Sequence, residues 1–229
     1  MKPNANLYIL KVILFLLFIF PCTYLLINSQ EKEKIKAKNI EIDKKNRIVT
    51  IQGSFNITNG IIEFLAASKK TTRDYESLIL LDCLPSELVT ALETAGFKPC
   101  YLNYKNCMNF KLQISWKWKG QDYKRNLKDF ISTNHKIKKS DNIAWLFTGS
   151  KPINKKIKED VNGEIIGLQP KIAGIIHINK DFGNPYNEDE QKGFNIKSSL
   201  FHKLFNEKKM LKSKDKMQKI PLKLIIQAK

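Results

Sequence analysis

The stretch SLILLDCLPSELVTALETAGFKP, residues 77–99, indicates the fold class. It opens with Ser77 and an uninterrupted apolar run, residues 78–81, which is typical of a β-strand that is buried on both faces. A helix is predicted next, because Pro85 suits the first helical position, where an amide has no intrahelical partner. Gly96 suits the left-handed residue that ends such a helix. The stretch therefore predicts a domain in which strands and short helices share one core.

The segments around this stretch are predicted to be mostly strands. Residues 40–42 and 48–53 fit two strands joined by a turn, and Asn59-Gly60 predicts a tight hairpin that returns through residues 61–67. FKLQISWKWKG, residues 110–120, alternates apolar and polar side chains, so one face should be buried and the lysine-bearing face exposed. Further strands are expected in IAWLFTGS, GEIIGLQ, IAGIIHIN and IPLKLIIQ, and a second helix in SSLFHKLFNEKK.

Strands outnumber helices in this sequence, and the two do not alternate regularly. The predicted fold class is therefore α+β, with a mainly antiparallel or mixed sheet and about two short helices, preceded by an N-terminal hydrophobic helix. Three parts are expected: a signal peptide or transmembrane anchor in residues 1–28, a charged tether in residues 29–39 and a globular domain in residues 40–229.

The N-terminal apolar segment predicts contact with a membrane. LYILKVILFLLFIFPCTYLLI, residues 7–27, is long enough to cross a bilayer as a helix of roughly 20 residues. Cleavage after Ser29 and retention as an anchor both stay open, whereas Pro21 and the apolar residues after Cys22 disfavour lipidation of that cysteine. The basic residues after the segment favour a cytoplasmic domain by the positive-inside rule. We nevertheless expect an extracytoplasmic, periplasmic location, because the segment opens the chain.

The net charge of +18 comes almost entirely from lysine, since three of the 40 basic residues are arginine. Arginine makes planar two-pronged contacts to phosphates and bases, and lysine does not. A specific nucleic-acid partner is therefore not expected. Weak attraction to anionic lipid is the expected by-product of so many lysines.

A small polar cluster, Tyr75-Glu76-Ser77, precedes the buried apolar run and is the first candidate for a functional site. Together with polar residues at other predicted strand ends it defines a candidate binding groove: Tyr75, Glu76, Ser77, Asp82, Thr148 and Ser150. Ser77 or Ser150 would serve a hydrolase only with a base within hydrogen-bond reach, and His177 is one candidate partner. The alternative is that these side chains satisfy backbone groups in turns.

The sequence predicts neither a metal site nor a cofactor. The three histidines, His135, His177 and His202, lack the spacing of metal ligands. The segment Asn187–Glu190 lacks the alternating ligand pattern of a calcium loop. Cys83 is expected to be a buried thiol. Cys100 and Cys107 are candidates for a disulfide if the domain lies outside the cytoplasm.

Several segments resemble one known family when they are taken in order. NRIVTIQGSFNITNGIIEFLAAS, YESLILLDCLPSELVTALETAGFKP, WLFTGS, EIIGL and IPLKLIIQ follow one another as in YdjY-domain proteins, and the resemblance covers residues 39–227. It implies an exported or lipid-anchored bacterial protein of unknown activity. Members of that family usually have His-Glu-Ser where this chain has Tyr75-Glu76-Ser77, so a role that needs the imidazole is in doubt.

Taken together, these features favour a non-enzymatic cell-envelope domain that binds a protein or a small ligand. Two alternatives stay open. One is an envelope hydrolase that uses Ser77 or Ser150, and the other is a cytoplasm-facing, membrane-tethered protein that binds lipid or polyanions through its lysines.

Overall fold

The computed structural model describes the folded part of the chain with several gaps. The described residues are 34–101, 107–133, 144–150, 157–169, 174–179, 194–205, 217 and 220–228. The expectations for residues 1–33 with Cys22, for His135 and for residues 187–190 lie outside them. Contacts divide the chain into Met1–Ile35 and Lys36–Lys229, and the fold given below is that of the second unit.

The described residues hold three α-helices, two 3-10 helices and fourteen strands. The helices are α2 (Pro85–Thr94), α3 (Glu159–Asn162), α4 (Ser198–Phe205), η1 (Asp74–Glu76) and η3 (Leu127–Phe130). The strands are β1 (Lys34–Ala37), β2 (Ile40–Asp43), β3 (Ile48–Phe55), β4 (Ile61–Ile62), β5 (Phe64–Ser68), β6 (Ser77–Leu81), β7 (Asn109–Trp118), β8 (Gln121–Asn126), β9 (Ile131–Thr133), β10 (Trp145–Phe147), β11 (Glu164–Gly167), β12 (Ile176–Ile178), β13 (Phe194–Ile196) and β14 (Pro221–Ala228). Within the described ranges, no helix has the length and hydropathy needed to cross a membrane.

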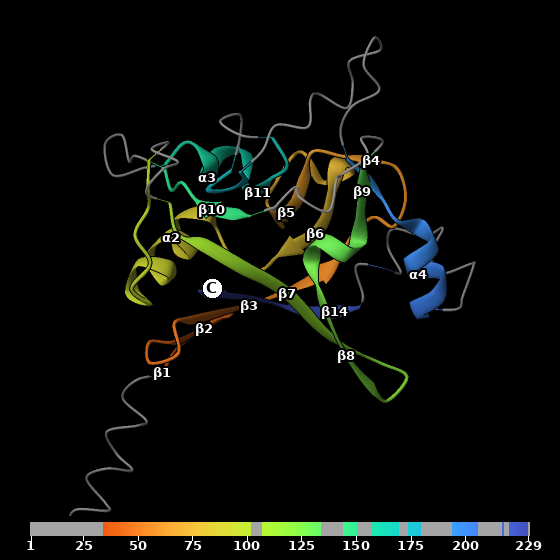
Figure 1. The fold of residues 1–229 in the computed structure, drawn as a ribbon, viewed down its shortest axis with the longest axis horizontal. Coiled ribbons are helices and arrows are strands. Elements are labelled where there is room, and N and C mark those ends of the chain that lie inside the picture. The colour runs from red at the N-terminus through yellow and green to blue at the C-terminus, as the bar shows by residue number, and fades with distance from the viewer. Residues whose placement is uncertain are drawn as a thin grey trace, which may run out of the picture. The chain divides into compact units, whose positions relative to one another are not determined.

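The main sheet closes on itself (Figure 1). Its strands follow in the order β3, β14, β7, β10, β12, β11, β5 and β6, and β6 then pairs with β3. The β5–β6 and β11–β12 pairs are parallel, and the other pairs in this ring are antiparallel. The α+β class with a mixed sheet is therefore confirmed. The closure was not part of the prediction.

Strand β3 changes partner along one of its edges, and a glycine makes the change possible. Its first half pairs with β2, where Ile51 lies opposite Ile40, and its second half pairs with β6, where Gly53 lies opposite Leu81. A Cβ atom at Gly53 would overlap the carbonyl oxygen of Leu80. The close approach of β6 that closes the sheet therefore requires a residue without a side chain at position 53.

The hairpin predicted at Asn59-Gly60 is wrong. Gly60 does adopt a positive φ of 104°, as a tight turn requires. However, β4 pairs with β13 in a separate sheet that also contains β9, and β5 pairs with β6 and β11. The edge of β3 that a hairpin partner would need is occupied by β6, which lies farther along the chain.

The predicted elements on either side of Asp82 are confirmed. Every residue of β6 is buried, as the continuous apolar run predicted. Helix α2 begins at Pro85 and is followed by Gly96 with a φ of 84°. Strand β7 alternates between buried and more exposed residues along most of its length, so its lysines lie on the outer face of the sheet.

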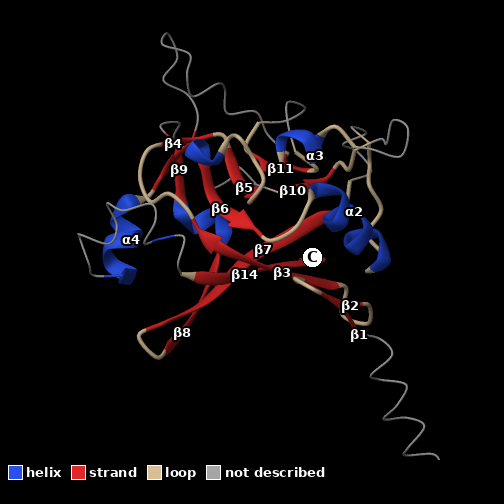
Figure 2. Cartoon of the chain, turned by 180° about the vertical axis from the view of Figure 1, so that it is seen from behind, coloured by secondary structure: helices blue, strands red, loops and turns tan. Residues whose placement is uncertain are grey.

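Aromatic side chains fill one end of the core, where α4 packs against the sheet. Phe55 makes edge-to-face contacts with Trp116, Phe201 and Phe205 at centroid distances of 5.4, 5.6 and 5.5 Å. Such pairs contribute stability beyond the apolar area that they bury. Helices α2 and α4 lie at opposite margins of the strands (Figure 2), and no helix among the described residues covers the outer face of β3, β14, β7 and β8.

Candidate functional site

The predicted cluster at residues 75–77 belongs to a buried turn in the structure. Tyr75 is 63 % exposed, whereas Glu76 and Ser77 are 2 % and 0 % exposed. The Ser77 hydroxyl donates a hydrogen bond to the carbonyl oxygen of Arg73 at 2.9 Å. The Asn56 amide donates to the carbonyl oxygens of Asp74 and Ser77 at 2.5 and 2.8 Å. Ser77 and its surroundings therefore satisfy backbone groups, which was the structural alternative for this cluster.

Glu76 takes part in a network of three carboxylates around one guanidinium. Arg73 pairs with Glu76 through Nε, with Glu63 through Nη2 at 2.5 Å and with Glu164 through Nη1 at 3.1 Å. The guanidinium also lies 4.8 Å from the ring centroid of Phe64. Arg73 thus holds the η1 turn against β11 and the loop before β5.

Burial and neighbouring charges shift the pKa values of Glu63 and Arg73 in this network. Burial raises the pKa of Glu63 above its ordinary 4.5, the negative charge of Glu76 raises it further, and Arg73 opposes both. Burial lowers the pKa of Arg73, but the hydrogen bonds to Glu76 and Glu164 outweigh burial and raise that pKa overall. The guanidinium is thus charged at every physiological pH and is held by its partners.

Thr148 and Ser150 lie beside a disulfide at the end of β10. The Thr148 hydroxyl donates a hydrogen bond to the carbonyl oxygen of Ile175 at 3.1 Å, and the Tyr101 amide donates to the carbonyl oxygen of Thr148 at 2.9 Å. The adjacent Cys100 is joined to Cys107 by a disulfide with a Cα–Cα distance of 5.1 Å. Ser150 is half-buried at the end of this segment. Thr148 therefore connects the segments that contain Ile175 and Tyr101 through hydrogen bonds.

Two further titratable side chains are buried in the core. His177 on β12 is 3 % exposed, and its Nδ1 lies 3.2 Å from the carbonyl oxygen of Gln169. Burial lowers the pKa of His177 below 6.5, although hydrogen bonds to the backbone of Gln169 and Gly174 oppose the shift. Burial raises the pKa of the Cys83 thiol to about 12. Both side chains are therefore neutral at neutral pH, and the Cys83 thiol is not the reactive thiolate.

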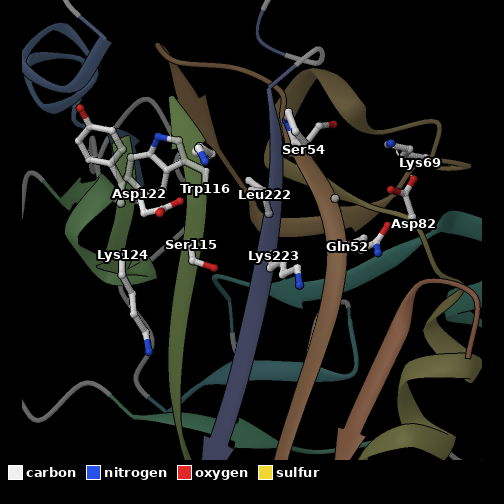
Figure 3. A pocket seen from close by; sticks show the side chains of 14 residues that line it. Gln52, Ser54, Lys69, Asp82, Ser115, Trp116, Asp122, Lys124, Leu222 and Lys223 are labelled. Atoms are coloured by element: carbon white, nitrogen blue, oxygen red, sulfur yellow. Dashed lines mark ion pairs between the residues drawn. The ribbon is translucent and has the colours of Figure 1, made fainter. Parts of the chain in front are cut away.

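A groove of about 770 Å³ runs across the uncovered outer face of β3, β14, β7 and β8 (Figure 3). Its polar lining comes from four strands and from the segments after β5 and β6: Gln52, Ser54, Lys69, Asp82, Ser115, Lys117, Asp122, Lys124 and Lys223. Gly53, Trp116, Tyr123, Pro221 and Leu222 complete it. At one end, Lys69 and Asp82 form an ion pair of 2.6 Å. The groove is large enough for a small organic ligand.

Among the six residues that the sequence predicted as a groove, Asp82 is the one that lines this groove. The other lining residues were missed. One indication was present, because the alternation in β7 predicted that Ser115 and Lys117 share the exposed face of a strand. The sequence could not show that Lys223 and Lys124 flank Ser115, since that depends on the pairing of distant strands. Within the described residues, no group of three His, Cys, Asp or Glu side chains is arranged to hold a metal ion.

Comparison with known proteins assigns the family. The model of the YdjY domain matches residues 40–202, which is more than half of the chain. The chain belongs to the YdjY-domain family. The resemblance found in the sequence is therefore confirmed, and the matched YdjY domain includes β2 to β13 but not β14. A search of curated proteins and a search of solved structures found no match.

Proposed function

We propose that this YdjY-domain protein is a non-enzymatic binding domain of the cell envelope and that it binds its ligand in the groove across β3, β14, β7 and β8. The observation that carries the proposal is the groove itself. It has a volume of about 770 Å³, it lies on the main sheet, and polar and charged side chains from four strands line it. Such convergent polar groups are what fixes the orientation of a bound ligand.

The surroundings of Ser77 favour binding over hydrolysis. A serine nucleophile needs a base that accepts its proton and an open path for the substrate. The Ser77 hydroxyl is buried and donates to a backbone carbonyl oxygen, and the neighbouring Glu76 pairs with Arg73. A nucleophilic role for Ser77 would require both contacts to break.

Two observations support an extracytoplasmic location. The apolar segment of residues 7–27 resembles a secretory signal or a membrane anchor. The disulfide between Cys100 and Cys107 is of a kind that persists in oxidising compartments and is rare in the cytosol. Protease added to intact spheroplasts should therefore digest the domain, and protection until lysis would contradict the location.

A groove-blocking variant tests the binding proposal. Ser115→Trp places an indole in the groove, and Gln113→Trp places one on the same face of the same strand outside the groove lining. We expect fractionated envelope metabolites to raise the thermal unfolding temperature of the wild type and of Gln113→Trp, but not of Ser115→Trp. The proposal fails if no fraction stabilises the wild type, or if both variants respond equally.

A further inference from the structure

The polar side chains in the groove form one row across four strands. Strand pairing places Lys124 of β8 opposite Ser115 of β7, Ser115 opposite Lys223 of β14, and Lys223 opposite Gln52 of β3. Figure 3 shows these four side chains on neighbouring strands on the open side of the sheet. With a strand spacing of about 4.8 Å, the Cα atoms of Lys124 and Lys223 lie on the order of 10 Å apart, with Ser115 between them.

The charges along this row are not balanced. Lys69 is neutralised by Asp82 at 2.6 Å, and Lys117 lies opposite Asp122 in the β7–β8 register. For Lys117, Lys124 and Lys223, no carboxylate in the described part of the chain lies within ion-pair distance, and only Lys117 faces a carboxylate in the strand register. Two lysines therefore flank Ser115 on the neighbouring strands, and their positive charges favour an anion in this part of the groove.

A second observation also indicates a ligand. Ser54 lines the groove and is 2 % exposed, yet its hydroxyl has no hydrogen-bond partner among the described residues. Ser54 shares the outer face of β3 with Gln52, since the two residues are two positions apart in a strand. A buried hydroxyl without a partner is uncommon and costs stability, so a ligand group or an ordered water is expected to complete its hydrogen bonding.

We propose that the Lys124–Ser115–Lys223 centre binds a phosphate ester, with the hydroxyl of Ser54 as a further contact to the ligand. This inference rests on the proposed role of the groove as the binding site. A tetrahedral phosphate presents several acceptor oxygens in different directions, so both ammonium groups and a hydroxyl can donate to it at once, whereas the two oxygens of a carboxylate lie in one plane. Lysine is also a common phosphate ligand in proteins. The ester comes either from a soluble metabolite or from a phospholipid headgroup.

Calorimetric titration of the full chain in a neutral detergent tests the proposal at physiological salt. The probes are glycerol phosphate for the soluble source, short-chain phosphatidylglycerol for the headgroup, and glycerate and a short-chain diacylglycerol as controls that lack phosphate. Saturable binding of either phosphate probe in preference to its control supports the proposal and identifies the source. Absence of binding by both, or equal binding of glycerate and glycerol phosphate, overturns it.

Matched variants separate this centre from the general positive charge of the protein. Lys124→Gln and Lys223→Gln should each weaken binding by about tenfold, the effect of losing one charge-assisted hydrogen bond. Lys111→Gln removes the same charge from an exposed position of β7 outside the groove lining and should leave affinity unchanged. An equal loss in all three variants means nonspecific attraction and overturns the proposal.

Ser54→Ala tests the contact to the buried hydroxyl. We expect weaker binding of the phosphate probe, with a free energy of unfolding that is unchanged or higher, because the variant removes an unpaired buried polar group. Unchanged affinity would overturn the assignment of this contact.

The same variants distinguish failure of this inference from failure of the proposed function. If envelope fractions still stabilise the wild type but not Ser115→Trp, while no phosphate probe binds, the groove remains a binding site and the phosphate assignment is wrong. If the fractions do not stabilise the wild type either, the proposed function fails as well.

Discussion

Replacement of Arg73 by glutamine should destabilise the fold strongly, because it leaves three carboxylates without their shared counterion. Glu76, Glu164 and Glu63 have side-chain exposures of 2, 7 and 15 %, so water cannot replace the guanidinium around them. Their mutual repulsion would then act in a medium that screens charge poorly.

The size of the effect follows from the burial of the network. Removing one partner of a buried ion pair costs about 3–5 kcal/mol of stability. Because the side chain of Arg73 is itself 30 % exposed, some water reaches the site, and we expect a loss near the lower limit, about 3 kcal/mol. Arg73→Lys keeps the charge but cannot donate to three carboxylates in the geometry of a guanidinium, so an intermediate loss is expected.

The loss should also depend on pH. Burial and the charge of Glu76 already raise the pKa of Glu63 above 4.5, and removal of Arg73 takes away a contribution that lowers it. The folded variant then binds a proton more tightly than the unfolded chain does. Lowering the pH towards 4.5 therefore stabilises Arg73→Gln relative to the wild type, and this stabilisation disappears as the pH rises through the pKa of the folded state.

Urea unfolding of the full chain in detergent, followed by tryptophan fluorescence at several pH values, measures both effects. Arg125→Gln is the matched control, since Arg125 is exposed on β8 and should change stability by less than about 0.5 kcal/mol. A loss in Arg73→Gln no larger than in Arg125→Gln, or a loss that grows as the pH falls, would refute this account of the network.

Three further predictions concern the rest of the fold. Gly53→Ala should lower the free energy of unfolding, measured in urea, by about 2 kcal/mol or more, because a Cβ atom overlaps the backbone of β6. A variant as stable as the wild type would contradict the requirement for close approach of β3 and β6. Replacing Cys100 and Cys107 by serine should lower the free energy of unfolding by about 2 kcal/mol, as expected for a disulfide with a sequence separation of 7. Chemical reduction of the wild type should lower it by the same amount, and an unchanged stability in either case would contradict the prediction. The wild type should lose stability as the pH falls below 6.5, because His177 binds a proton in the unfolded chain but resists it when buried. His177→Gln should lack this loss. The same dependence of stability on pH in both proteins would contradict the burial argument.

Local elements of this fold were predictable because their determinants are local. Pro85 and Gly96 fix the ends of α2 through the backbone geometry that each prefers, and the alternation in β7 fixes which face is buried. The hairpin at Asn59-Gly60 failed for the opposite reason. The turn residues predicted the local backbone correctly. However, β3 pairs with β6 and β14, which lie farther along the chain, and the turn sequence does not encode those pairings.

In the candidate groove, too, some lining residues could be predicted from local sequence and others could not. Asp82 could be predicted because it follows a recognisable strand, and it does line the groove. Lys124, Ser115 and Lys223 come together only through the registers of two strand pairs, which no pattern within a single segment encodes. The surroundings of Glu76 and Ser77 could not be predicted, because the ion pair between Glu76 and Arg73 depends on how the η1 turn folds.

Strand β14 lies between β3 and β7, although both of these strands precede it in the chain by a long way. A chain that is synthesised or translocated from its N-terminus must therefore hold the facing edges of β3 and β7 unpaired until residues 221–228 emerge. Exposed strand edges recruit other chains, and folds dominated by such distant pairings form slowly. Crowding of nascent chains should therefore promote aggregation through these two edges before the last strand is inserted.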